Sequence, residues 1–196
     1  MTALVRLARS RAELDAAVAR CRRMVTRRAL ASAGVALVPA PGIDVAADVA
    51  LLTELIPAIN REFGLTPDQI ETLNPRVKAL VYKAIVAFGA AMVGRLITRE
   101  LIAQALLKVG VRVTAKTAAR LVPVAGQAVA AGLSFGAMRL VGESHIRDCR
   151  RVVDSLAVAV ADDPPSPGDG LRPGAAQRLR SAAAATAARL RRRPRE

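Results

Sequence analysis

The chain has 196 residues, of which 53% are hydrophobic and only 2% aromatic, so its core has to consist mainly of Ala, Val, Leu and Ile side chains. This composition is typical of closely packed helices rather than of a β-sandwich, and the predicted fold is an all-α multi-helix bundle. The formal net charge of +14 lies almost entirely at the two ends, with +6 in residues 1–28, +7 in residues 171–196 and only +1 between them. Two cysteines and one histidine exclude a disulfide framework and a zinc site of the usual ligand spacing.

Residues 1–28 are predicted to form a basic amphipathic helix. Ser10 and Glu13 have the spacing of a capping box, which would start this helix. The apolar side chains that follow recur at helical spacing, at Leu14, Val18, Cys21 and Val25. Arginines surround the rest of the helix, and we expect them to contact an anionic membrane or another polyanion. They include Arg22, Arg23, Arg27 and Arg28.

A helical domain is predicted over residues 29–161, and its first feature is a proline-glycine corner. Pro39 and Pro41 cannot continue the preceding helix, and Gly42 permits a tight reversal. The next helix is expected to start near Asp44. Asp44 and Asp48 then lie in its first turn and a half, where free N–H groups and the helix dipole favour carboxylates.

A second, similar corner follows 84 residues later. Residues 121–131 match residues 37–47 at seven of eleven positions, and the corner residues there are Pro123 and Gly126. We interpret both corners as structural turns between helices, without a chemical role.

Local signals bound the helices between the two corners. Gly64 is the expected left-handed residue after the end of a helix. Residues 66–69 form a capping box, and Asn74 precedes a proline at the first position of another helix. The run that follows is too long to remain one straight helix in a domain of this size, so we expect a break between residues 89 and 98.

The last long helix is predicted from residue 126 to about residue 160. Within it, Gly132 and Gly136 have the spacing of small residues at close helix contacts. The composition of residues 162–170 predicts a linker, and the Arg/Ala-rich residues 171–196 are expected to be a disordered tail or a marginal helix. Three arginines of this tail are further candidates for membrane or polyanion contact, namely Arg191, Arg192 and Arg193.

The apolar segments are short for membrane spans. The longest stretch without charge covers residues 121–138, or 18 residues, and Pro123 and Gly126 interrupt it. Crossing ~30 Å of hydrocarbon takes about 20 apolar residues in a helix. We therefore favour a cytoplasmic protein that is peripheral on the inner membrane, with an integral inner-membrane protein as the alternative.

The sequence contains no convincing catalytic, cofactor or metal site. Residues 110–117 approach a phosphate-binding P-loop, but Ala115 stands where the second glycine is required. His145 and Cys149 share a helical stripe with apolar neighbours, which favours packing over nucleophilic catalysis. We expect no enzyme activity, no cofactor and no small-molecule substrate.

Residues 38–52, together with residues 63–65 and 122–136, resemble the helical domain that follows the GTPase domain of immunity-related (interferon-inducible) GTPases. They are also similar to a bacterial helical domain that accompanies Era-like GTPases. The resemblance covers roughly residues 29–155 and implies a helical domain that, in its relatives, couples a GTPase to self-association and membrane contact. The GTPase half is missing here, so the resemblance does not imply GTP hydrolysis.

These observations predict a non-catalytic helical interaction module. Its expected partners are a protein, either a separate GTPase or a second copy of the chain, and an anionic membrane surface. The first alternative is the integral membrane protein with helical hairpins. The second is a basic protein associated with nucleic acid, which the absence of aromatic stacking residues from both basic ends disfavours.

Overall fold

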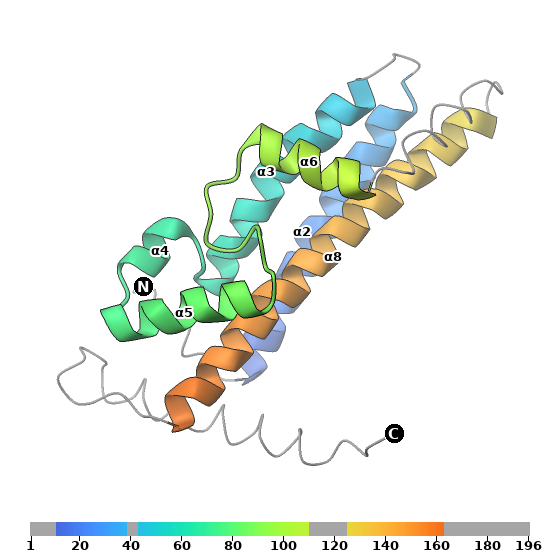
Figure 1. The fold of residues 1–196 in the computed structure, drawn as a ribbon. Coiled ribbons are helices and arrows are strands. Elements are labelled where there is room, and N and C mark those ends of the chain that lie inside the picture. The colour runs from blue at the N-terminus through green and yellow to red at the C-terminus, as the bar shows by residue number, and fades with distance from the viewer. Residues whose placement is uncertain (1–10, 39–42, 110–124, 163–196) are drawn as a thin grey trace, which may run out of the picture. The chain divides into compact units, whose positions relative to one another are not determined.

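The computed structural model describes residues 11–38, 43–109 and 125–162, and over these residues the fold is all-α, as predicted (Figure 1). No strand occurs in the described ranges. The helices are α2 (Arg11–Ala36), α3 (Ile43–Phe63), α4 (Pro67–Glu71), α5 (Pro75–Ala87), α6 (Arg99–Val109) and α8 (Ala125–Asp162). Helix α2 continues without a break through residue 28, so the predicted basic helix and the start of the predicted helical domain are one element.

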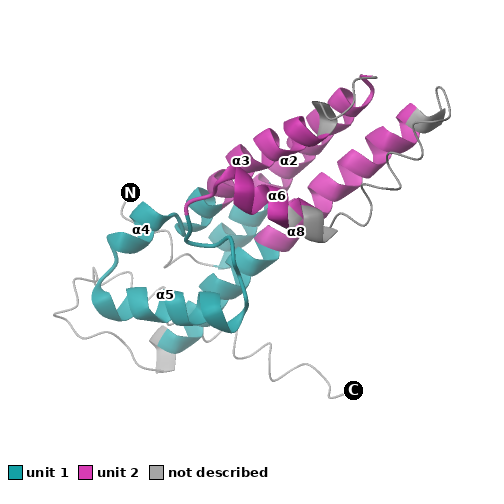
Figure 2. Cartoon of the chain, turned by 45° about the horizontal axis from the view of Figure 1, so that its top comes forward, with its two compact units in different colours: residues 1–19, 60–95, 146–196 teal, residues 20–59, 96–145 magenta. Residues whose placement is uncertain are grey.

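The chain divides into two compact units (Figure 2). In the described ranges, unit 1 comprises residues 11–19, 60–95 and 146–162, and unit 2 comprises residues 20–38, 43–59, 96–109 and 125–145.

Unit 1 confirms the local signals in the sequence. Gly64 has a φ of 76°, which glycine adopts readily, and it ends α3. Thr66 and Gln69 form the capping box at the start of α4, with each side chain bonded to the backbone of the other residue. The Asn74 side chain caps α5 by accepting a hydrogen bond from the Val77 N–H at 2.8 Å.

The predicted break after α5 lies in residues 88–98, where Gly89 and Gly94 have φ values of 61° and 68°. Gly94 also allows a close approach, because a Cβ atom there would lie 2.8 Å from Cδ1 of Ile70. The core of unit 1 is aliphatic with one aromatic ring. Its buried side chains include Phe63, Leu65, Ile70, Val81, Ile146, Val152 and Leu156.

In unit 2, α2 packs against both α3 and α8. The buried face of α2 in this unit carries small and β-branched side chains, which lets its neighbours approach closely. The buried residues of this unit include Cys21, Val25, Ala29, Leu52, Ile56, Ile102, Ala130, Met138 and Val141. Polar groups are buried as well, and Oγ of Ser32 on α2 donates a hydrogen bond to the Asp48 carboxylate on α3.

The two predicted corners lie mostly outside the described residues. The corner residues that the structure does not describe are Pro39, Pro41, Gly42 and Pro123. The tail arginines Arg191, Arg192 and Arg193 also lie outside the described ranges. The flanking helices begin where they were predicted, since α3 starts one residue before Asp44 and α8 starts one residue before Gly126. In the part of the chain that the structure describes, no helix has both the length and the apolar character needed to cross a bilayer.

Candidate anion-binding site

The strongest functional feature lies on the exposed side of α2 in unit 2. Cys21, Val25 and Ala29 form the buried stripe of the helix, so helical periodicity turns the arginines between them toward solvent. Arg22 and Arg23 are exposed, as is Arg27 one turn later. The apolar stripe that the sequence predicted for this helix is thus buried in the structure.

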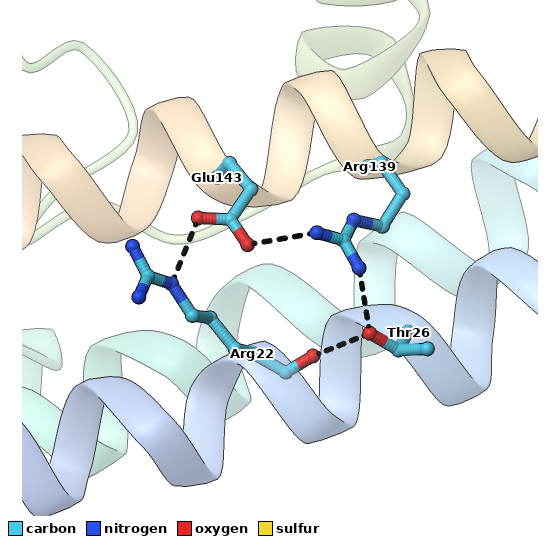
Figure 3. A network of polar contacts seen from close by, with 4 residues as sticks. All are labelled: Arg22, Thr26, Arg139 and Glu143. Carbon is cyan, nitrogen blue, oxygen red and sulfur yellow. Dashed lines mark hydrogen bonds and ion pairs between the residues drawn. The ribbon is translucent and has the colours of Figure 1, made fainter.

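Two helices contribute to one polar network on this side of unit 2 (Figure 3). Glu143 on α8 lies between two arginines, and its Oε2 accepts from Nε of Arg22 at 3.2 Å while its Oε1 accepts from Nη2 of Arg139 at 3.4 Å. The hydroxyl of Thr26 accepts from Nη1 of Arg139 at 2.9 Å and donates to the carbonyl oxygen of Arg22 at 2.9 Å. A single carboxylate therefore serves two guanidinium groups from different helices.

The remaining arginines of α2 differ in their partners. Nη1 of Arg28 lies 2.6 Å from Oε2 of Glu54 on α3, so the charge of Arg28 is balanced within the unit. Arg23 and Arg27 form no ion pair with any described residue. Of the four arginines of α2 predicted to contact a membrane or polyanion, Arg28 thus differs from Arg23 and Arg27 by its ion pair with Glu54.

Arg22, Arg23, Thr26, Arg27 and Arg139 line one cavity of about 410 Å³. The four guanidinium groups and the neighbouring Glu143 carboxylate give it a formal charge of +3. Guanidinium groups form forked, charge-assisted hydrogen bonds with carboxylates and phosphates. The arrangement is therefore suited to binding an anion.

Exposed apolar residues follow the arginines on the same side of α2. Positions 23, 27, 30, 34 and 37 share one helical face, and the backbone turn continues past the helix end to Val38. Leu30 is 61% exposed, Leu37 50% and Val38 48%. Val45, near the start of α3, is also exposed. The basic part of this side of α2 is thus followed by exposed apolar residues at the C-terminal end of the helix.

His145, Cys149 and Asp48 are all buried. His145 is 1% exposed and burial lowers its pKa to about 4, so the ring is neutral near neutral pH. Cys149 is completely buried, and its Sγ donates to Oδ1 of Asn60 at 3.5 Å. Asp48, the sixth residue of α3, accepts a hydrogen bond from Ser32 across the helix pair. Within the described ranges, no three side chains suited to metal binding come together.

The predicted contact role of Gly132 and Gly136 is corrected within this chain. Both glycines are exposed, and no atom of another described segment lies within 4 Å of where their Cβ atoms would be. The close contact occurs instead at Gly142, where a Cβ atom would lie 2.6 Å from Val25. The spacing motif placed the glycines on one helical face, but packing turned that face to solvent.

Arg139, Glu143 and Thr26 were not among the predicted site residues. Arg139 and Glu143 have the i,i+4 spacing of a helical ion pair, which is the one local signal that marks them. Their contacts with α2 join residues that lie more than a hundred positions apart in the sequence, so no local pattern predicts them. No family model, curated protein or solved structure matches the chain. The resemblance to GTPase-associated helical domains therefore stays a prediction.

Proposed function

We propose that the chain is a non-catalytic helical module that attaches peripherally to an anionic membrane surface through the exposed side of α2. The observation that carries this proposal is the order of residues along that side. Arg23 and Arg27 are exposed and form no ion pair with a described residue, and exposed Leu30 and Leu37 follow on the same face.

The two parts of this surface supply different contributions to binding. Each arginine near an anionic leaflet contributes about 1 kcal/mol, an attraction that salt weakens. Apolar side chains that enter the interface contribute about 25 cal/mol for each Å² removed from water. Stable attachment to a membrane generally takes two such signals. Both occur along one face that runs from Arg23 on α2 to Leu37, the first residue after the end of the helix.

The chemistry of α2 supports a membrane over a nucleic acid. The helix contains no aromatic residue on which a base could stack, and exposed leucines would not improve contact with a phosphate backbone. On the membrane, the module would act with a protein partner, either a separate GTPase or a second copy of the chain. The sequence resemblance supports such a partner.

Co-sedimentation of the full chain with vesicles tests this proposal. Vesicles of neutral phosphatidylcholine are compared with vesicles that also contain phosphatidylserine, at low and high salt. We expect binding to the anionic vesicles only, and we expect salt to weaken it. Absence of binding to anionic vesicles at low salt would overturn the proposal.

Three double variants distinguish binding through this surface from binding through the overall net charge of the chain. Arg23→Ala/Arg27→Ala should weaken vesicle binding strongly. The matched control, Arg28→Ala/Arg151→Ala, removes the same charge from residues that already pair with Glu54 and Asp148. Leu30→Gln/Leu37→Gln should weaken binding without changing charge. Equal losses in the two arginine pairs would show that only overall charge matters.

A further inference from the structure

The cavity in unit 2 is more specific than a basic surface requires. Its arginines come from two helices, and the two that flank Glu143 are oriented by defined hydrogen bonds (Figure 3). Arg139 is positioned by the Thr26 hydroxyl, which is itself anchored to the backbone of α2. An anion entering here would find donors already in place, which lowers the entropic cost of binding.

Glu143 uses only a small part of the donor capacity around it. A guanidinium group carries five N–H donors, and Arg22 and Arg139 each direct a single nitrogen at this carboxylate. The separations of 3.2 and 3.4 Å exceed the ~2.8 Å of strong charge-assisted hydrogen bonds. Arg23 and Arg27 also line the cavity, and neither has an ion-pair partner in the described ranges. The donors thus exceed what one carboxylate can accept.

We infer that this cavity binds a phosphate monoester, which displaces Glu143 from between Arg22 and Arg139. A phosphate monoester carries a charge between −1.5 and −2 at neutral pH and three strong acceptor oxygens. It therefore satisfies several guanidinium groups at once, which the single carboxylate of Glu143 does not. The volume of about 410 Å³ holds such a group together with a small attached moiety.

The same phosphate monoester can be free or be part of a lipid headgroup. The inference rests on the proposed function where the lipid is concerned, because the cavity lies on the side of α2 assigned to the membrane. In that setting Glu143 acts as an internal competitor that holds the site in its basic, unliganded arrangement.

Calorimetric titration of the full chain tests the site with inorganic phosphate and glycerol 3-phosphate as soluble probes. Arg139→Ala should weaken binding about tenfold or more, since hydrogen bonds to charged groups contribute ~1.5–3 kcal/mol. Arg139→Lys keeps the charge but loses the fork and should also bind more weakly. Arg28→Ala, which lies on the same helix but outside the cavity, should bind as the unmodified chain does.

Glu143→Gln provides the decisive comparison. If Glu143 competes with the ligand, removal of its charge should tighten phosphate binding several-fold. If Glu143 only stabilises the helix pair, the variant should unfold at a lower temperature and bind no more tightly. That second result would overturn the role of Glu143, and absence of phosphate binding in both proteins would overturn the site.

Vesicles distinguish the site from the general attachment. Phosphatidic acid exposes a phosphate monoester, whereas phosphatidylglycerol offers a diester, and the two are compared at matched surface charge. Preference for phosphatidic acid that is lost in Arg139→Lys supports the site. Equal binding to both lipids without binding of soluble phosphate would overturn it and leave the membrane proposal standing. Binding of soluble phosphate without binding to either vesicle would overturn the membrane proposal and leave the site standing.

Discussion

Gly142 on α8 lies directly against the side chain of Val25 on α2. A Cβ atom built at Gly142 would lie 2.6 Å from Cγ2 and 2.7 Å from Cγ1 of this valine, closer than Cβ contacts in folded proteins. The absence of a side chain at Gly142 therefore sets how closely α2 and α8 can approach in unit 2.

This contact predicts opposite effects of alanine at two glycines of α8. Gly142→Ala should lower the free energy of unfolding by about 1–3 kcal/mol, because Val25 is branched and fully buried and has little room to move. Gly136→Ala should raise it by roughly 0.5–1 kcal/mol, because space is open there and alanine favours the helix. Urea denaturation followed by circular dichroism measures both. Equal destabilisation at the two positions would contradict the assigned contact.

The buried hydrogen bond from Ser32 to Asp48 predicts a coupled pair between α2 and α3. Both side chains are buried, so Ser32→Ala should cost about 1–3 kcal/mol by removing a donor from a buried carboxylate. A double-mutant cycle with Asp48→Asn should give a coupling energy above about 0.5 kcal/mol. Strictly additive losses would show that the two side chains do not depend on each other.

Substitution of the buried Asn60 is predicted to destabilise unit 1. It is 1% exposed, and its Nδ2 donates to the carbonyl oxygen of Met92 at 3.1 Å while its Oδ1 accepts from Cys149. Asn60→Leu should destabilise the unit by about 1–3 kcal/mol, because the Met92 carbonyl loses a donor. Cys149→Ala leaves the bond from Asn60 to Met92 in place, so it should lower the free energy of unfolding by less than Asn60→Leu does. A thermal melt in which Asn60→Leu matches the unmodified chain would contradict this assignment.

Because His145 is buried, the free energy of unfolding is predicted to fall in acid. Burial lowers its pKa from 6.5 to about 4, so between these values the unfolded chain binds a proton that the folded chain does not. Stability therefore falls as the pH drops through this window, by up to about 3 kcal/mol. His145→Gln should remove this dependence, and denaturation at several pH values measures the difference between the two proteins.

The difference between the two proteins also separates the contribution of His145 from that of two carboxyl groups on α8. Burial raises the pKa of Asp148 and of Asp154, which acts in the opposite sense because each then binds a proton more readily when folded. Both are present in the variant and in the unmodified chain, so their contributions cancel. A stability difference that stays constant with pH would contradict the buried, neutral state of His145.

The limits of the helices could be predicted from the sequence because they depend on local backbone chemistry. Gly64 supplied the left-handed turn that ends α3, and the side chains of Thr66 and Asn74 capped the next two helices. The break after α5 likewise occurs at two glycines with positive φ. The basic and apolar sides of α2 followed from periodicity alone.

The candidate site depends on which helical faces meet, and only the tertiary structure decided that. Arg139 and Thr26 are 113 residues apart, and their contact exists because α2 and α8 pack closely at Gly142. The same packing joined Arg22 to Arg139 through Glu143 and left Gly132 and Gly136 exposed, whereas the packing of α2 against α3 brought Arg28 to Glu54. Local patterns specify where each helix begins and which of its sides is apolar. Which apolar sides pack against each other depends on how side chains from distant parts of the sequence fit together in the core. A local sequence pattern holds no information about that fit.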